Sequence, residues 1–118
     1  MRGLTGDELL QRPVRVRGIE LGRLADLILD PAGRRVIGFD VLCGDGEHRF
    51  LPIAAAESHP GEIAVRSSLT LLDGAELSFY RERGTTLTAL RSQDPADVVL
   101  GDDGVVAGRA RNGDTPSS

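Results

Sequence analysis

The chain carries the same hairpin pattern twice, and this repeat constrains its fold more than any other feature. Residues 25–39 read ADLILDPAGRRVIGF, and residues 96–109 read ADVVLGDDGVVAGR. In both copies, a run of branched or leucine residues leads into turn-forming Asp and Gly residues and then into a second strand-like run. This order is typical of a β-hairpin, so the repeat predicts a mainly β fold. Internal duplication and convergence of two hairpins on the same turn chemistry are the alternative explanations.

The return strands of the two copies differ in character. Phe39 and Val41 in the first copy correspond to Arg109 and Arg111 in the second copy. Because the second hairpin lacks an apolar return strand, it cannot form a hydrophobic core by itself. We expect it to pack onto the first copy or onto another chain.

Strand periodicity assigns faces to the first hairpin, since successive side chains of a strand point to opposite faces. The residues expected on the inner face of the outgoing strand are Ala25, Leu27 and Leu29, and those expected on its other face are Leu24, Asp26, Ile28 and Asp30. The residues expected to share one face of the return strand are Ile37, Phe39, Val41 and Cys43.

The rest of the chain divides into short strands and a helical segment. Further strands are expected at residues 13–18, 47–53 and 62–66, with a loop at 57–61 before the fifth strand. One or two short helices are expected after it, because Asp73 and Glu76 have the spacing of a capping box. Gly84 is expected to follow the first helix.

These segments are expected to form one domain over residues 1–109. Its parts are a core at 10–70, a helical segment at 73–92 and the repeated hairpin at 95–109. The polar residues 110–118 are expected to form a flexible tail.

The segment LGRLADLILDPAGRRVIGFDV, followed by RFLPI, resembles the PRC-barrel domain. The matching positions are Leu21, Gly22, Arg23, Asp26, Asp30, Gly33, Arg34, Leu51 and Pro52. The likeness covers residues 10–70 and, more weakly, 94–109. PRC-barrel domains form the cytoplasmic part of the photosynthetic reaction-centre H subunit and the C-terminal domain of ribosome maturation factors. The resemblance implies a small PRC-type β-barrel that serves as an interaction module and has no catalytic residues among these positions.

The chain departs from both of these PRC-barrel proteins. Neither the N-terminal β-barrel of the ribosome maturation factors nor the transmembrane helix of the H subunit is expected from this sequence. We therefore expect only the fold and a bias towards protein–protein contact to carry over.

Four of the matching positions also have a structural interpretation. Gly22 and Gly33 are expected in tight turns, where a side chain would strain the backbone. Asp26 is expected on the outer strand face, where it accepts hydrogen bonds from a neighbouring loop or from Arg23. Pro52 indicates a strand end or a sheet edge, because proline cannot donate to a β-ladder.

Composition narrows the possible partners. The net charge is −4 and aromatic residues make up 3% of the chain, so direct nucleic-acid binding is not expected. No apolar run approaches the ~20 residues that cross a bilayer, so no membrane insertion is expected. The N-terminus does not resemble a secretory signal, and the single cysteine, Cys43, cannot form an internal disulfide. Both features favour a cytoplasmic location.

No residue pattern predicts a catalytic, cofactor or metal site. The spacing of Cys43, His48 and His59 matches no zinc site, and a fourth ligand is missing. Neither a nucleophile motif such as G-x-S-x-G nor a phosphate-binding glycine motif occurs. The acidic residues expected to be solvated in or beside turns are Asp40, Asp45, Glu47, Asp94, Asp97, Asp102 and Asp103.

The partner surface is expected on the helical segment, with Tyr80, Arg81 and Arg83 as its candidate residues, or on the barrel edge that this helix leaves open. The alternative is that this helix docks as a lid on the chain's own barrel. We expect a non-catalytic protein–protein interaction or scaffold module with an unidentified partner, and a homodimer formed through unpaired strand edges. The alternatives are a ribosome-maturation factor acting through protein contacts and a small ligand-binding barrel or enzyme.

Overall fold

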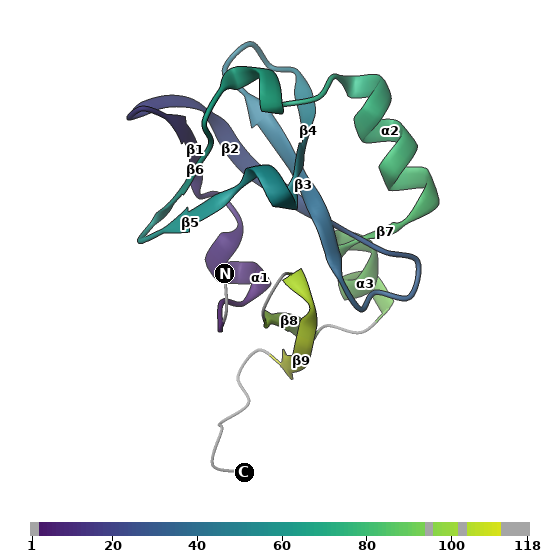
Figure 1. Ribbon diagram of the computed structural model, residues 1–118. Helices are drawn as coiled ribbons and strands as arrows, with labels where there is room; N and C mark the ends of the chain where they lie inside the picture. The colour runs from purple at the N-terminus through teal and green to yellow at the C-terminus, as the bar shows by residue number, and fades with distance from the viewer. Residues whose placement is uncertain (1–2, 94–95, 102–103, 112–118) are drawn as a thin grey trace.

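The computed structural model describes residues 3–93, 96–101 and 104–111, and the chain folds mainly as β-strands (Figure 1). In chain order, the elements begin with α1 Gly6–Leu9, β1 Pro13–Val16, β2 Ile19–Leu29, β3 Val36–Cys43, β4 His48–Pro52, the 3-10 turn η1 Ile53–Ala55, β5 Glu57–His59 and β6 Glu62–Ala64. They continue with the 3-10 turn η2 Ser68–Thr70, α2 Gly74–Arg83, β7 Thr85–Thr86, α3 Leu87–Gln93, β8 Ala96–Leu100 and β9 Val106–Arg111. The prediction of a mainly β fold is confirmed, and the expected loop at 57–61 contains the additional strand β5.

Most strands belong to one bent sheet with the order β4-β3-β2-β1-β6-β5, and β7 pairs with β2 (Figure 1). The pair β1–β6 is parallel, and the other pairs of this sheet are antiparallel. The end strands β4 and β5 follow each other in the chain through η1. Within the described residues they do not pair with each other, so the sheet does not close into a barrel.

The long hairpin β2–β3 forms the centre of this sheet, and Asp30 organises its turn. The Asp30 carboxylate accepts a hydrogen bond from the Arg34 amide at 2.8 Å, and the Asp30 carbonyl accepts one from the Gly33 amide at 2.9 Å. Gly33 has a φ of +68°, a conformation that glycine adopts without steric cost. Local turn chemistry thus places Gly33 as the sequence suggested.

A bulge in β2 changes the expected faces of the outgoing strand. Leu24 pairs with Val41 and Asp26 pairs with Asp40, so Ala25 is an extra residue in β2. The alternation therefore shifts at this point. Leu24 is buried in the main core instead of lying on the opposite face.

A second bulge does the same to the return strand. Ile28 pairs with Gly38 and Leu29 pairs with Val36, which leaves Ile37 as an extra residue in β3. Val36 consequently faces the main core, and Ile37 packs on the other side of the sheet. The prediction that Ile37 shares a face with Phe39 is wrong, because one extra residue reverses a period-two pattern.

The sheet is apolar on both faces around this hairpin. The main core contains Leu9, Val14, Leu24, Leu27, Leu29, Val36, Phe39, Val41, Cys43, Leu51, Ile63, Val65, Leu87, Val98 and Leu100. The second, smaller cluster contains Ile28, Phe50 and Leu77, with Ile37, Leu72 and Tyr80 packed against it. Leu77 and Tyr80 belong to α2, so this helix covers the second face as a lid.

Gly22 lies inside β2 and not in the tight turn that we expected. A Cβ atom there would collide with the Leu42 carbonyl and the Cys43 backbone of the neighbouring strand. Strand β2 also has an extra residue, Leu21, beside this position in its pairing with β1. Glycine is therefore required at position 22 by the close approach of β3. Pro52 is the last residue of β4, which is an end strand of the sheet.

The helix start at residue 73 follows from local capping. The Asp73 carboxylate accepts a hydrogen bond from the Glu76 amide at 3.1 Å, and α2 then runs to Arg83. Gly84 follows it with a φ of −108°, so it does not adopt the left-handed conformation of many helix ends. Its lack of a side chain matters because a Cβ atom would collide with the Leu29 carbonyl.

The C-terminal hairpin β8–β9 packs onto the rest of its own chain. Val98 and Leu100 of β8 are buried in the main core. Thr5 bridges Val99 of β8, and Arg35 bridges Val105 just before β9. The return strand β9 is not apolar, so the apolar side chains of β8 pack instead against the core formed by the first hairpin. The last part of the expected tail, residues 112–118, lies outside the described residues.

Candidate functional site

The three residues of the predicted partner surface diverge on α2. Tyr80 is half-buried, and its ring stacks on Phe50 of β4 with centroids 4.3 Å apart. Arg83 lies over the ring of Phe79, with 4.4 Å between its guanidinium carbon and the ring centroid. Arg81 lines a pocket that includes neither Arg83 nor Phe79 among its lining residues. The structure therefore combines Arg83 with Phe79, a residue that the predicted surface did not include.

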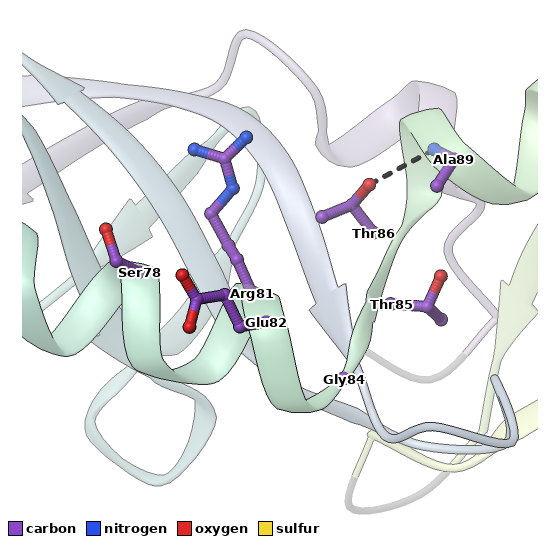
Figure 2. A pocket seen from close by; sticks show the side chains of 7 residues that line it. All are labelled: Ser78, Arg81, Glu82, Gly84, Thr85, Thr86 and Ala89. Carbon is purple, nitrogen blue, oxygen red and sulfur yellow. Dashed lines mark hydrogen bonds between the residues drawn. The ribbon is translucent and has the colours of Figure 1, made fainter.

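The pocket beside Arg81 lies between α2 and the segment β7–α3 (Figure 2). Its lining residues are Ser78, Arg81, Glu82, Gly84, Thr85, Thr86 and Ala89. Its volume is about 380 Å³, but it is open to solvent, and five of its seven lining residues carry a hydroxyl or charged group. Small-molecule sites are usually enclosed and mostly apolar. This pocket thus suits polar contact at a surface better than the capture of a small ligand.

Asp40 and His48 form a pair that the sequence pattern did not indicate. Asp40 lies in β3 with 5% of its surface exposed, although it was expected to be solvated near a turn. Its Oδ1 atom is 2.7 Å from Nδ1 of His48. An Asp–His pair supports nucleophilic catalysis when a hydroxyl or thiol reaches the other imidazole nitrogen. Within the described residues, no such group is hydrogen-bonded to His48, so the pair orients the imidazole at the sheet edge.

Asp45 remains in the β3–β4 turn, where it binds Arg49. The two guanidinium nitrogens of Arg49 lie 3.1 and 2.9 Å from the two carboxylate oxygens of Asp45. This hydrogen bonding, followed by that of the Glu47 amide, lowers the pKa of Asp45 to about 2. The pair holds the turn in shape at an exposed position.

Asp26 accepts hydrogen bonds at the start of α3. Its Oδ1 atom receives the amide of Leu27 at 2.9 Å and the amide of Thr88 at 3.3 Å. Thr86 precedes α3, and its hydroxyl accepts a hydrogen bond from the Ala89 amide at 3.1 Å. We call the acceptor group of this aspartate the Asp26 cap site. A neighbouring segment thus provides its donor, whereas Arg23 approaches Glu20 instead.

Asp97 makes the equivalent contacts at the start of α1. Its carboxylate receives the amide of Val98 at 2.8 Å and the amide of Asp7 at 2.9 Å. Thr5 precedes α1, and its hydroxyl accepts a hydrogen bond from the Glu8 amide at 3.2 Å. We call this group the Asp97 cap site. Asp97 is only 5% exposed, so the expectation that it is solvated is wrong.

The two cap sites show that the sequence repeat extends to tertiary contacts. Thr86 pairs with Ile28, and Thr5 pairs with Val99, which is the residue equivalent to Ile28 in the second copy. Each of the two helices docks on the repeat hairpin that does not directly follow it in the chain. Helix α1 precedes the first hairpin but caps against the second, whereas α3 precedes the second hairpin but caps against the first. The repeated Ala-Asp pair was the feature of the sequence that could have indicated the two cap sites. The threonines that precede the capped helices lie far from these aspartates in the chain, so the sites could not be assembled from local patterns.

Arg91 of α3 connects the two helices at the Asp97 cap site. Its Nη2 atom lies 2.7 Å from Oδ1 of Asp7 and 2.9 Å from Oδ1 of Asp97. Partial burial alone would lower the pKa of Arg91, but its hydrogen bonds to Asp97 and Asp7 outweigh this effect and raise it. The guanidinium therefore stays charged and neutralises the buried carboxylate.

Cys43 is buried, and among the described residues no three His, Cys, Asp or Glu side chains are grouped so that they could hold a metal ion. None of the helices in the described part of the chain has the length and apolar character needed to cross a membrane. The chain matches no family model, and no curated protein is significantly similar to it.

Proposed function

We propose that this chain is a non-catalytic protein-interaction module of the PRC-barrel type, with the outer surface of α2 as its contact site. The observation that carries this proposal is a stack of aromatic rings that leads from the sheet to the surface. Phe50 is buried, Tyr80 stacks on it, and Phe79 meets Tyr80 edge-on with centroids 5.2 Å apart. Phe79 itself is 45% exposed.

These contacts prepare Phe79 for binding. Tyr80 supports one part of the ring and Arg83 covers another, so the side chain loses little conformational freedom when a partner packs against it. Aromatic and arginine side chains are also enriched among the residues that dominate binding energy at protein interfaces. Arg81 adds a second cation beside the open pocket. A protein partner with carboxylate and apolar groups fits this surface.

Charge reversal tests the proposal. The double variant Arg81→Glu/Arg83→Glu is expected to weaken capture of partner proteins from the native cell at least about tenfold, because it removes both cations and uncovers Phe79. The matched control is Arg66→Glu, which changes an exposed arginine away from α2. Quantitative mass spectrometry of the captured proteins provides the measurement. A set of partners that both variants retain equally would contradict the α2 surface.

We further propose that the module is a cytoplasmic homodimer. The free, buried thiol of Cys43 is compatible with a reducing compartment. Within the described residues, β9 pairs with β8, and it contacts the Arg34 carbonyl through the amide of Val106. Its outer edge beyond Val106 is thus available to a second copy. Light scattering on the purified chain tests the dimer, and a monomer at all concentrations would contradict it.

A further inference from the structure

Within one chain, each helix docks on the repeat hairpin that does not directly follow it in sequence, and this arrangement indicates how two chains could associate. We propose that residues 3–10, which we call the N-terminal arm, exchange between two copies of this chain. The arm of each copy then docks on β8 and the Asp97 cap site of the other copy. This inference rests on the homodimer proposed above and adds a second contact, between the arm and β8, to the β9 edge from which that dimer was argued.

The contacts of the arm with β8 are suited to exchange because they form one compact set. The Gly3 amide donates to the Leu100 carbonyl at 2.7 Å, and the Leu100 amide donates to the Leu4 carbonyl at 2.8 Å. The Asp7 amide reaches the carboxylate of Asp97 at 2.9 Å. A second copy supplies the same groups in the same geometry, so the exchange requires no new complementary surface.

The side chains of the arm add to this set. Leu9 is fully buried in the main core, and Asp7 binds Arg91 of α3. Gly6 lies so close to Asp97 and Leu87 that a Cβ atom would collide with both side chains. The acceptor surface is therefore specific for the residues of this arm, which commits it to a copy of the same chain.

Gln11, directly after the arm, provides the hinge. It has a φ of +69°, a left-handed conformation that costs a non-glycine residue conformational energy. The next residue, Arg12, precedes Pro13, and a residue before proline favours extended backbone. An extended Gln11 removes the strain and directs the arm away from its own β8. Short hinges under strain favour exchange of this kind.

The chain already shows the required docking with the other helix. At the Asp26 cap site, α3 and its preceding Thr86 dock on β2 in the way that α1 and Thr5 dock on β8. The docking geometry thus depends on a threonine-capped helix start meeting an aspartate-bearing strand. It does not depend on how the two are connected along the chain.

Disulfide trapping tests the exchange. The Leu100–Leu4 hydrogen bond makes Thr5 and Val99 a non-hydrogen-bonded antiparallel pair, whose Cα atoms lie about 4.5 Å apart, within disulfide range. In a Cys43→Ala background, the variant Thr5→Cys/Val99→Cys is expected to form covalent dimers on mild oxidation. The fraction of covalent dimer should equal the dimer fraction that light scattering measures for the same variant before oxidation.

The repeat offers a matched control, Thr86→Cys/Ile28→Cys in the same background. This pair has the equivalent position at the Asp26 cap site but lies on no exchangeable arm, so its disulfide should remain within one chain. A dimeric protein in which Thr5→Cys/Val99→Cys links only within one chain overturns the exchange and leaves the dimer in place. A monomeric protein overturns the dimer as well.

Hinge variants test the same inference without added cysteines. Gln11→Gly relieves the strain of the closed form, so it should lower the dimer association constant about 30-fold, counting both hinges. Gln11→Pro cannot adopt a positive φ, and it cannot replace the hydrogen bond that the Gln11 amide donates to the Leu24 carbonyl at 2.8 Å in the closed form. It should therefore raise that constant by at least as much. Light scattering over a concentration series measures both. Equal association constants for the two variants would overturn the exchange.

Discussion

The Asp97 cap site makes the sharpest prediction about stability. Asp97→Ala removes the acceptor of two backbone amides, those of Asp7 and Val98, and one partner of Arg91. Each buried donor left without a partner costs about 1–3 kcal/mol, and Arg91 retains Asp7. The free energy of unfolding should therefore fall by about 3–5 kcal/mol, a range also typical of breaking a buried ion pair. Urea unfolding followed by far-UV circular dichroism measures the change.

Asp26→Ala is the matched control, because Asp26 accepts the equivalent amides in the other copy of the repeat. The Asp26 site is less buried, its bond to the Thr88 amide is longer at 3.3 Å, and no described ion pair involves its carboxylate. We expect a loss of about 1–2 kcal/mol. A larger loss for Asp26→Ala than for Asp97→Ala would refute the reasoning, since burial and the Arg91 contact would then not determine the cost.

Two further predictions concern the β3–β4 turn and the central strands. Arg49→Gln should raise the pKa of Asp45 from about 2 towards 3.8, measured by NMR titration; a value that stays near 2 would show that Arg49 is not its cause. Because the folded-state pKa is lowered, the stabilisation from this pair is present above pH 3.8 and is lost as the pH falls towards 2. Gly22→Ala should lower stability by about 1–3 kcal/mol, because its Cβ meets the backbone of β3, whereas Gly44→Ala, with no atom within 4 Å of its Cβ, should leave the urea midpoint nearly unchanged.

The elements that the sequence predicted well depend on local chemistry. The turn at Asp30 and Gly33 and the helix start at Asp73 need only residues a few positions apart. The same holds for the end of β4 at Pro52, where one missing amide hydrogen ends the ladder. Such signals are present in the chain before it folds, so they can be read without tertiary contacts.

The bulges at Ala25 and Ile37 were not predictable in this way. A period-two pattern assigns every residue of a strand to a face, but one extra residue reverses the pattern on one side of it, which made the assignments of Leu24 and Ile37 wrong. Where that residue lies depends on the register with the neighbouring strand, as with Leu24 and Val41. The role of Gly22 was also not predictable from local patterns, because glycine is required there by the nearby backbone of β3 and not by a turn.

The candidate surface on α2 was predicted only in part. The sequence singled out Tyr80, Arg81 and Arg83 as neighbours, but a helix directs consecutive residues to different sides. Docking on the sheet decided that Tyr80 stacks on Phe50 and that Phe79 remains exposed beside Arg83. The exposed aromatic ring could be identified only after the buried side of the helix was known.

The sequence by itself determined that this protein is mainly β and that its hairpin pattern occurs twice, because strand propensity and turn chemistry act over a few residues. Tertiary structure decided that, within the chain, α1 docks on the second hairpin and α3 docks on the first. The amide of Asp7 reaches Asp97 across 90 positions, and the amide of Thr88 reaches Asp26 across 62. Contacts at such separations form only when the intervening strands have packed, since each requires the backbone to bring a strand and a helix start together. Local sequence patterns carry no information on which helix meets which strand.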